Sequence, residues 1–293
     1  MEKMSEKLAI LIPTRNRPEI LKTTLLELQS AGFGEVPLWV YDDCSTDSMA
    51  IRTMVEQTWA GGRVLRGEER VGQAQGRNIL MRACGKEFGL FLDDDSFPKS
   101  AEGLQKHLSH DPKLRRAVIT FQYMDVPTQR YSTPVELGEG ISRSFQGGGS
   151  LFHIPTVLGL GGFRSFFVYG YEEPELSCRL QLNDYHIWYD PSMVVHHNHF
   201  ETPAEFRNYR EYDYLYARNG ILMSSLNMPL WIGLPHGLLR SLRRSLHRKR
   251  HFWPKVKGTS SGLWLTFARP GERKAHSIRQ VIDWIRFSRT CPR

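Results

Sequence analysis

The amino-acid sequence predicts an α/β protein, a doubly wound mixed sheet followed by a C-terminal amphipathic helical extension. Two observations support this prediction. Up to residue 100, short apolar runs alternate with segments in which leucine recurs at helical spacing, the pattern of a sheet whose strands are joined by helices. Beyond residue 230, basic residues are interleaved with leucine and tryptophan, as in amphipathic helices.

Seven elements make up the first part of this alternation. They are a strand at residues 8–13, a helix over Leu21, Leu25 and Leu28 that stops at Gly32, a strand ending in Asp42 and Asp43, a helix capped within residues 45–47 and running through Val55, a short third strand, a helix from near Gln73, and a strand at 88–92. Because ligands of such sheets bind outside the carboxyl ends of the strands, we expect the polar residues after each strand to share one site.

Length and composition fit a globular chain. Of the 293 residues, 40% are hydrophobic and 24% are charged, which supplies a core and argues against disorder. The four cysteines are scattered and form no CxxC pair, which favours a reducing compartment. The apolar run near the N-terminus is too short for a signal peptide. We therefore expect a cytoplasmic protein.

Three carboxylates in a row, in "FLDDD", follow the fourth strand. Side chains alternate along a strand, so Asp93 and Asp95 point to one side and share a ligand, whereas Asp94 points away and has a structural role. Hard oxygen ligands select Mn²⁺ or Mg²⁺. The alternative is an acidic cap or a solvated loop, because charge clusters are common where loops begin.

Two further clusters carry chemistry in the second half of the chain. "GYEEPELSCRL" places Glu172, Glu173 and Glu175 in the first turn of a helix, where they either complement the helix dipole or supply a general base. "VVHHNH" places His196, His197 and His199 after an apolar pair, where one of them is either a packed surface residue or a metal ligand. "GQAQGR" matches neither a dinucleotide fingerprint nor a P-loop.

Several segments, in order, resemble one family, the nucleotide-sugar glycosyltransferases of the Rossmann-like GT-A fold, and within it the inverting family two with its many bacterial members. The segments are "LAILIPTRNRPEILKTTLLELQ", "WVYDDCSTD", "GQAQGRNILMRAC", "FLDDD", "GGGSLFHIP", "YGYEEPELSCRL", "YDPSMVVHHNH" and "YARNGILMSSLNMP". The resemblance covers about residues 7–230 and implies a GT-A catalytic domain at 1–230, with a donor-binding half at 7–100 and an acceptor and catalytic half at 101–230. Residues 231–293 then form the helical extension.

The resemblance also implies roles for individual residues. Those expected to bind the nucleotide sugar are Pro13, Thr14, Arg15, Asp42, Asp43, Arg77, Asp93 and Asp94. Those expected at the metal, Mn²⁺ or Mg²⁺, are Asp95, Asp93 and His197, with His196 and His199 as weaker candidates. Gly148, Gly149 and Glu175 are expected on the acceptor side. Glu173, with Glu172 beside it, falls where the family has its catalytic aspartate.

The implied activity is a metal-dependent transfer, with inversion, from a nucleoside-diphosphate sugar to a hydroxyl of a glycan or lipid-linked acceptor in surface polysaccharide synthesis. Glutamate where the family has aspartate moves the carboxylate by one methylene. Because of this difference, the alternative that the protein is a catalytically inactive, nucleotide-binding member of the fold stays open. A sugar-nucleotide pyrophosphorylase is a second alternative, although the sequence has "PTRNRP" where such enzymes have a Gly-rich loop.

The positive charge is concentrated in the C-terminal part. Between Tyr214 and Gly271 the sequence has ten Lys and Arg and no Asp or Glu. We expect residues 234–257 to form a basic amphipathic helix, with a stripe made of Leu234, Leu238, Leu242 and Leu246 and with Trp231 and Trp253 near its ends. Such a helix binds anionic lipid, where each basic residue adds about 1 kcal/mol, or else packs on the catalytic domain.

Membrane binding would place the protein peripherally on the inner face of the plasma membrane, where lipid-linked acceptors are found. Nucleic acid is not an expected partner, because no nucleic-acid-binding motif accompanies the charge. A second amphipathic helix, with Ile278, Val281, Ile282 and Ile285 on its apolar side, is expected to pack back on the body of the protein.

Overall fold

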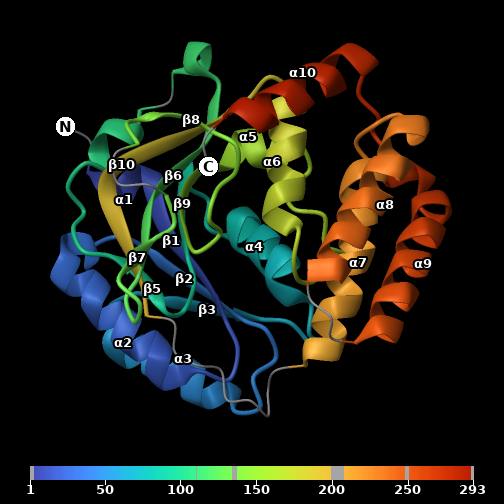
Figure 1. The fold of residues 1–293 in the computed structure, drawn as a ribbon. Coiled ribbons are helices and arrows are strands. Elements are labelled where there is room, and N and C mark those ends of the chain that lie inside the picture. The colour runs from blue at the N-terminus through green and yellow to red at the C-terminus, as the bar shows by residue number, and fades with distance from the viewer. Residues whose placement is uncertain (1–2, 110, 134–136, 199–207, 248–250, 292–293) are drawn as a thin grey trace.

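The computed structural model describes residues 3–109, 111–133, 137–198, 208–247 and 251–291 (Figure 1). The strands are β1 (Leu8–Thr14), β2 (Leu38–Asp42), β3 (Arg63–Arg66), β4 (Phe88–Leu92), β5 (Ser96–Pro98), β6 (Arg116–Asp125), β7 (Arg130–Tyr131), β8 (Gly140–Ser142), β9 (Gly149–His153) and β10 (His186–His197). The α-helices are α1 (Met4–Lys7), α2 (Pro18–Leu28), α3 (Ser48–Thr58), α4 (Gly72–Ala83), α5 (Ile154–Gly159), α6 (Glu172–Leu182), α7 (Tyr209–Ser225), α8 (Leu230–His247), α9 (Phe252–Ala268) and α10 (Ile278–Thr290). A π-helical turn, Gln29–Phe33, continues α2, and 3₁₀ turns lie at Gln105–His107, Pro112–Leu114 and Pro270–Glu272.

One mixed sheet carries the fold, in the order β3-β2-β1-β4-β9-β6-β10-β5, with β7 beside β6 and β8 beside β10. Strands β1 to β4 pair in parallel. Strand β9 is antiparallel to both of its neighbours, β4 and β6, while β6 and β10 are parallel to each other. The predicted α/β fold with a mixed sheet is confirmed.

Helices cover both faces of the sheet, and β1 shows why (Figure 1). Its even-numbered apolar residues, such as Ile10, pack with α2 and α3 in one core, and its odd-numbered ones, such as Leu11, pack with α4, α5 and α6 in another. Because alternate side chains point to opposite faces, a continuous apolar run is what a strand between two helical layers requires.

The predicted helix limits in the first half are confirmed closely. Gly32 takes a positive φ of 91° where α2 and its π-helical turn end, a conformation that costs glycine little. The Asp47 side chain accepts a hydrogen bond from the Ala50 backbone N–H and caps α3. Helix α4 begins at Gly72, one residue before the predicted start.

Helices α7 to α10 stand beside the sheet, on the side of α6 (Figure 1). A third apolar core, which includes Phe167, Leu182, Leu222 and Trp284, joins α6 to α7 and α10. Helix α10 therefore packs on the body, as predicted, but through Val281 and Trp284, while Ile278 and Ile282 stay exposed. Within the described residues no helix is both long and apolar enough to cross a membrane.

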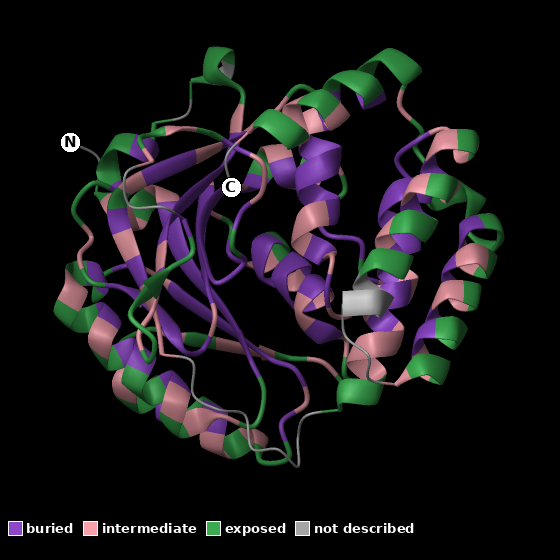
Figure 2. Ribbon diagram, in the orientation of Figure 1, coloured by how far each residue is buried: buried purple, intermediate pink, exposed green. Residues whose placement is uncertain are grey.

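The single helix predicted over residues 234–257 is wrong. Two helices occupy this region, α8 and α9, and Trp253 belongs to the second. Leu238 and Leu242 of the predicted stripe are exposed, and α8 instead buries Gly233, Gly237 and Ser241 (Figure 2). The side chain of Leu246 lies outside the described residues.

Candidate active site

A cavity of about 840 Å³ opens at the carboxyl ends of β1, β2 and β4 and continues toward α6, α7 and α8. Most of the predicted site residues line it, and the sheet brings them together from segments far apart in the chain. They are Pro13, Thr14, Arg15, Asp43, Asp93, Asp94, Asp95, Glu172, Glu173 and His197.

The "DDD" turn is fixed by hydrogen bonds to its neighbours. The Ser96 hydroxyl accepts from the Asp93 N–H at 2.8 Å and donates to the Gly148 carbonyl at 2.5 Å, which ties the turn to the start of β9. The Asp94 carboxylate accepts from the Thr14 hydroxyl at 2.7 Å and from Arg17 at 2.6 Å. Burial raises the pKa of Asp94 to about 7, although Arg17 opposes the shift. Asp94 thus locks the turn to β1, the structural role predicted for it.

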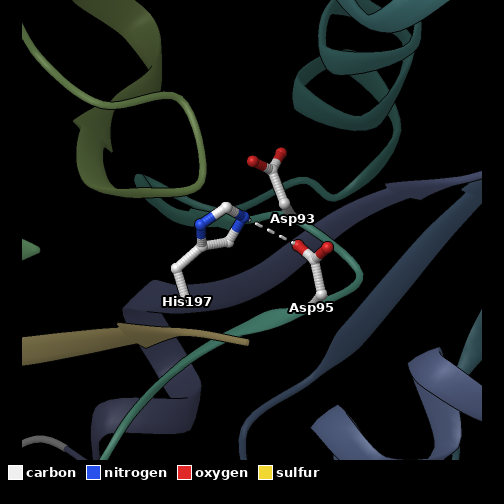
Figure 3. Close-up of side chains that lie close together, drawn as sticks. All are labelled: Asp93, Asp95 and His197. Atoms are coloured by element: carbon white, nitrogen blue, oxygen red, sulfur yellow. Dashed lines mark ion pairs between the residues drawn. The ribbon is translucent and has the colours of Figure 1, made fainter. Parts of the chain in front are cut away.

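Asp93, Asp95 and His197 form a candidate metal site. One ligand atom from each lies within 4.8 Å of the other two (Figure 3). The Nε2 atom of His197, at the end of β10, is 3.2 Å from Asp95 Oδ1, and Arg17 Nη2 donates to Asp95 Oδ2 at 2.8 Å. Burial favours the neutral acid, but His197 and Arg17 outweigh it and hold the pKa of Asp95 below its usual range. Two carboxylates and an imidazole suit Mn²⁺ or Mg²⁺, so the residues fit the predicted ion.

His196 is not part of this cluster. His196 points to the opposite side of β10, as its position next to His197 requires, and its ring lies 6.0 Å from that of Phe97. His199 lies outside the described residues. Of the three candidates, His197 is the one that the structure brings to the acidic turn.

The two acids at the end of β2, Asp42 and Asp43, have different surroundings. Asp43 lines the cavity and accepts hydrogen bonds from the backbone N–H groups of Val71, at 2.7 Å, and Gly72. It therefore joins the end of β2 to the start of α4. Asp42 is fully buried, is absent from the cavity wall and pairs with Arg66 at 2.5 Å. The structure thus leaves Asp43, and not Asp42, available to a ligand.

Glu173 faces the cavity from the first turn of α6, as predicted. Its side chain is 28% exposed, and its carboxylate accepts a hydrogen bond from the Gly147 N–H at 2.9 Å. Burial and the nearby Asp93 raise its pKa, and Arg77 opposes the shift. Glu172, which is more deeply buried, has its pKa raised to about 8 by burial and by the charge of Glu173. Burial therefore favours the neutral form of Glu172, and Glu173 is the acid with the more exposed side chain and the hydrogen bond from Gly147.

Arg77 lies behind the cavity wall. Its side chain is only 1% exposed, and it is not among the residues that line the cavity. Its guanidinium donates to Asp93 at 3.2 Å and lies 3.9 Å from Glu173. Two of its nitrogens, Nε and Nη1, are buried without a hydrogen bond. Arg77 therefore contacts the carboxylates of Asp93 and Glu173 without lining the cavity itself.

The residues expected on the acceptor side also lie behind the wall. Glu175 is buried and pairs with Arg164 at 2.9 Å and with Arg179 at 3.0 Å. Burial alone would raise the pKa of Glu175, but the two arginines outweigh it and hold the pKa below its usual value. Gly148 and Gly149 pack too closely for side chains, since a Cβ on Gly148 would overlap the Asp93 carboxylate and one on Gly149 would lie 3.0 Å from the Tyr123 ring. None of the three is part of the cavity wall.

Sequence reasoning missed an aromatic wall beyond Glu173. It consists of Tyr169, Tyr171, Tyr212 and Tyr216. Tyr169 stacks on Tyr212 with ring centroids 4.6 Å apart, and Arg240 of α8 lies 5.6 Å from the Tyr171 ring and also lines the cavity. The four-residue spacing of Tyr212 and Tyr216, which puts both on one helix face, is the signal that would have indicated part of this wall.

Comparisons with known proteins agree with this geometry. A curated protein of Haemophilus influenzae described as an uncharacterized glycosyltransferase is 29% identical over 110 residues, and the match spans only 36% of each chain.

Three solved structures share the fold. GalNAc-T7 with UDP, GalNAc and Mn²⁺ has a TM-score of 0.65 at 14% identity, covering 99% of this chain and 58% of that one. TarS 1–349 of S. aureus with UDP-GlcNAc has a TM-score of 0.58 at 17% identity, covering 96% and 81%. The mannosyltransferase PcManGT of Pyrobaculum calidifontis with GDP-Man and Mn²⁺ has a TM-score of 0.56 at 15% identity, covering 97% and 87%.

The family itself follows from a sequence model rather than from these distant structures. The model described as glycosyl transferase family 2 matches residues 9–166, which is more than half of the chain. That span includes β1, β2, β4 and the acidic turn of the cavity. The chain belongs to glycosyl transferase family 2.

Proposed function

We propose that the protein is a metal-dependent, inverting glycosyltransferase that moves a sugar from a nucleoside-diphosphate sugar to a hydroxyl group. The observation that carries the proposal is that one cavity is lined both by the cluster of Asp93, Asp95 and His197 and by Glu173. The first suits a cation beside a diphosphate, and the second suits a base beside an attacking hydroxyl.

The donor half of the proposed site lies at the sheet edge. Pro13, Thr14 and Arg15, at and just after the end of β1, and Asp43, after β2, line the cavity next to the acidic turn. We assign the nucleoside to these residues. The three structural neighbours named above carry UDP, UDP-GlcNAc or GDP-Man, which supports a nucleoside-diphosphate sugar without choosing the base.

Asp93, Asp95 and His197 would hold Mn²⁺ or Mg²⁺. When bound, such an ion neutralises negative charge on a departing diphosphate. Arg17, which bonds Asp94 and Asp95, and Arg77, which bonds Asp93, keep the carboxylates in place. The protein thus presents its acids already oriented, which lowers the cost of assembling the site.

Glu173 is the proposed base. It would take the proton of the acceptor hydroxyl as the oxygen attacks the anomeric carbon. A single displacement of this kind inverts the configuration at that carbon. The Gly147 N–H and Arg77 hold the Glu173 carboxylate in place, and burial favours the neutral form of the neighbouring Glu172.

The acceptor would enter over the tyrosine wall. Tyrosine rings give broad apolar faces with a polar edge, which suits the alternating surfaces of a sugar. The acceptor proposed here is a glycan or a lipid-linked intermediate of surface polysaccharide synthesis, and Arg240, which lines this part of the cavity, suits the phosphate of a lipid-linked acceptor. It would be met at the inner face of the plasma membrane.

An inactive, nucleotide-binding member of the fold is the main alternative, and a sugar-nucleotide pyrophosphorylase is a weaker one that the family match disfavours. The replacement Glu173→Gln separates transfer from binding. The assay uses the nucleoside-diphosphate sugar that the wild type cleaves, with water or a glycan as acceptor. In Glu173→Gln we expect the rate of nucleoside diphosphate release to fall roughly 10²–10⁴-fold, the usual contribution of a general base. Donor affinity should stay unchanged.

The control is Glu56→Gln, an exposed glutamate on α3, which should behave as the wild type. Release that is insensitive to Glu173→Gln would contradict the assignment of the base. Binding without release by the wild-type protein, across uridine, guanosine and deoxythymidine diphosphate sugars, would favour the inactive alternative.

A further inference from the structure

Among their described side chains, α8 and α9 present most of the large apolar ones to solvent, while Ile232 and Leu265 pack on the third apolar core. The exposed large hydrophobic residues of these two helices are Trp231, Leu238, Leu239, Leu242, Phe252, Trp253, Val256, Trp264 and Phe267. The three tryptophans are each 67–69% exposed. Soluble proteins rarely gather so much apolar surface unless it meets a membrane or a partner.

The inner faces of the same helices are built from small residues. A Cβ on Gly237 of α8 would lie 2.9 Å from the Ile221 Cα of α7, and one on Gly262 of α9 would lie 2.7 Å from the Arg218 carbonyl oxygen. Both helices therefore approach the α7 backbone closely. This arrangement is the reverse of an ordinary amphipathic helix, which buries its large side chains and exposes its small ones.

The two exposed faces border each other. Ser241 of α8 and Thr259 of α9 share a hydrogen bond of 3.0 Å, so the helices touch along this line as well as packing on α7. Leu242 follows Ser241, and Val256 lies one turn before Thr259. We call the nine residues named above the outer apolar surface.

Charge indicates what covers this surface. From Tyr214 to Gly271 the sequence has ten basic residues and no acidic one, and exposed Arg243 and Lys257 lie on α8 and α9 themselves. A second copy of the chain would bring two positive surfaces together, which disfavours a dimer here. Tryptophan, leucine and basic side chains on one helical surface match the interface of an anionic bilayer.

We infer that the outer apolar surface of α8 and α9 docks the protein on an anionic phospholipid membrane. Its tryptophan and leucine side chains enter the headgroup region, and Arg243 and Lys257 pair with lipid phosphates. This docking does not depend on catalysis. Only the delivery of a lipid-linked acceptor rests on the proposed function: Arg240, on another face of α8, lines the cavity, so one helix joins the membrane surface to the site.

The test is co-sedimentation of the full chain with vesicles of phosphatidylcholine alone or mixed with phosphatidylglycerol. We expect binding to the anionic vesicles that weakens with salt, together with a blue shift of tryptophan emission, because the other four tryptophans are not exposed. Trp231→Ser, Trp253→Ser and Trp264→Ser combined should lower vesicle affinity at least tenfold. The matched control, Leu26→Ser with Met49→Ser on α2 and α3, removes exposed apolar residues elsewhere and should change nothing.

Nucleoside diphosphate binding should be equal in all variants and shows that each is folded. No binding of the wild type to anionic vesicles, or equal binding by the triple variant, would overturn the inference. Self-association that the triple variant abolishes would instead assign the surface to a second copy. A wild type that transfers sugar but does not bind anionic vesicles would refute docking alone, whereas a wild type that binds vesicles but transfers no sugar would refute the proposed function alone.

Discussion

At the scale of single residues, neighbouring carboxylates of the cavity differ because their surroundings differ. Asp94 meets Thr14 and Arg17 in a buried position, and its pKa rises to about 7. Asp95, one residue later, meets His197 and Arg17, which outweigh burial and lower its pKa. The same contrast separates Glu173 at the cavity from Glu175 behind it.

Gly148 offers a test of whether the position of the Asp93 carboxylate matters for metal binding. A Cβ there would overlap the Asp93 carboxylate, and that carboxylate, as the end of a side chain, can move away. We expect Gly148→Ala to displace Asp93 and to lower metal-dependent activity by roughly a hundredfold, since a small misplacement of a catalytic group has effects of this size. Activity measured against metal concentration should show a raised requirement for the metal.

The matched control is Gly159→Ala in α5, where a new Cβ meets nothing within 4 Å. It should keep full activity and an unchanged melting temperature. If Gly148→Ala also keeps its activity and metal requirement, Asp93 does not take part in binding the ion.

Most of the residues predicted from sequence line the cavity, because acids at the carboxyl ends of strands are a local pattern. It could not separate Asp42 from Asp43, or Glu173 from Glu175, since burial of one of two close acids depends on distant partners such as Arg66 and Arg164. Arg77 was assigned to the nucleotide for the same reason. Its burial behind Asp93 follows only from how α4 packs on the sheet.

At the scale of elements, β10 is held at its middle by a buried acid. Asp190 is 1% exposed and pairs with His107 Nε2 and with Lys106 Nζ, each at 2.7 Å, which joins β10 to the turn before β6. Burial by itself would raise the pKa of Asp190, but these hydrogen bonds prevail and lower it. Since β10 ends at His197, this contact also supports the metal cluster.

We expect Asp190→Asn to lower the free energy of unfolding by about 2 kcal/mol at pH 7, the scale of lost charged hydrogen bonds. A carboxyl whose pKa is lowered on folding stabilises above its unfolded pKa, about 3.9 for Asp, and this contribution is lost as the pH falls toward the folded value. The gap in melting temperature between wild type and variant should therefore narrow below about pH 4.

Thermal melting between pH 3 and pH 8, by circular dichroism, measures this gap. The control Asp47→Asn changes an exposed helix cap to another good cap residue and should melt like the wild type at each pH. A gap for Asp190→Asn that is constant with pH, or absent at pH 7, would contradict the role of the charge.

The helices of the C-terminal part were the least predictable elements. The leucine spacing predicted one helix with a leucine stripe that meets either lipid or the catalytic domain, and the stripe itself carries no information on which helix face meets α7. Glycine and serine at four-residue intervals, at Gly233, Gly237 and Ser241, decide this packing in the structure. Close backbone approach stabilises the contact, and the leucines are left outside.

At the scale of the whole molecule, the mixed sheet brings the edge proposed to bind the donor and the helix that carries Glu173 to one cavity. The acids of the first half lie at the carboxyl ends of β2 and β4, and β10 brings His197 to the same edge. On the far side, α7 lines the cavity with Tyr212 and Tyr216, and α8 lines it with Arg240. The alternation of strands and helices was readable from sequence, whereas the return of β10 depends on pairings between distant segments.

The most direct test of the account is a thermal-shift titration of uridine, guanosine and deoxythymidine diphosphates, with and without Mn²⁺, on the wild type and Asp95→Ala. We expect one nucleotide to stabilise the wild type only with Mn²⁺, by about 2.7 kcal/mol at a hundredfold excess over its Kd, and to have little effect on Asp95→Ala. Glu56→Ala, an exposed acid on α3, should respond as the wild type. A folded wild type that responds to no nucleotide, or that responds equally without Mn²⁺ and without Asp95, would contradict the assignment of this cavity to a metal-bound nucleotide sugar.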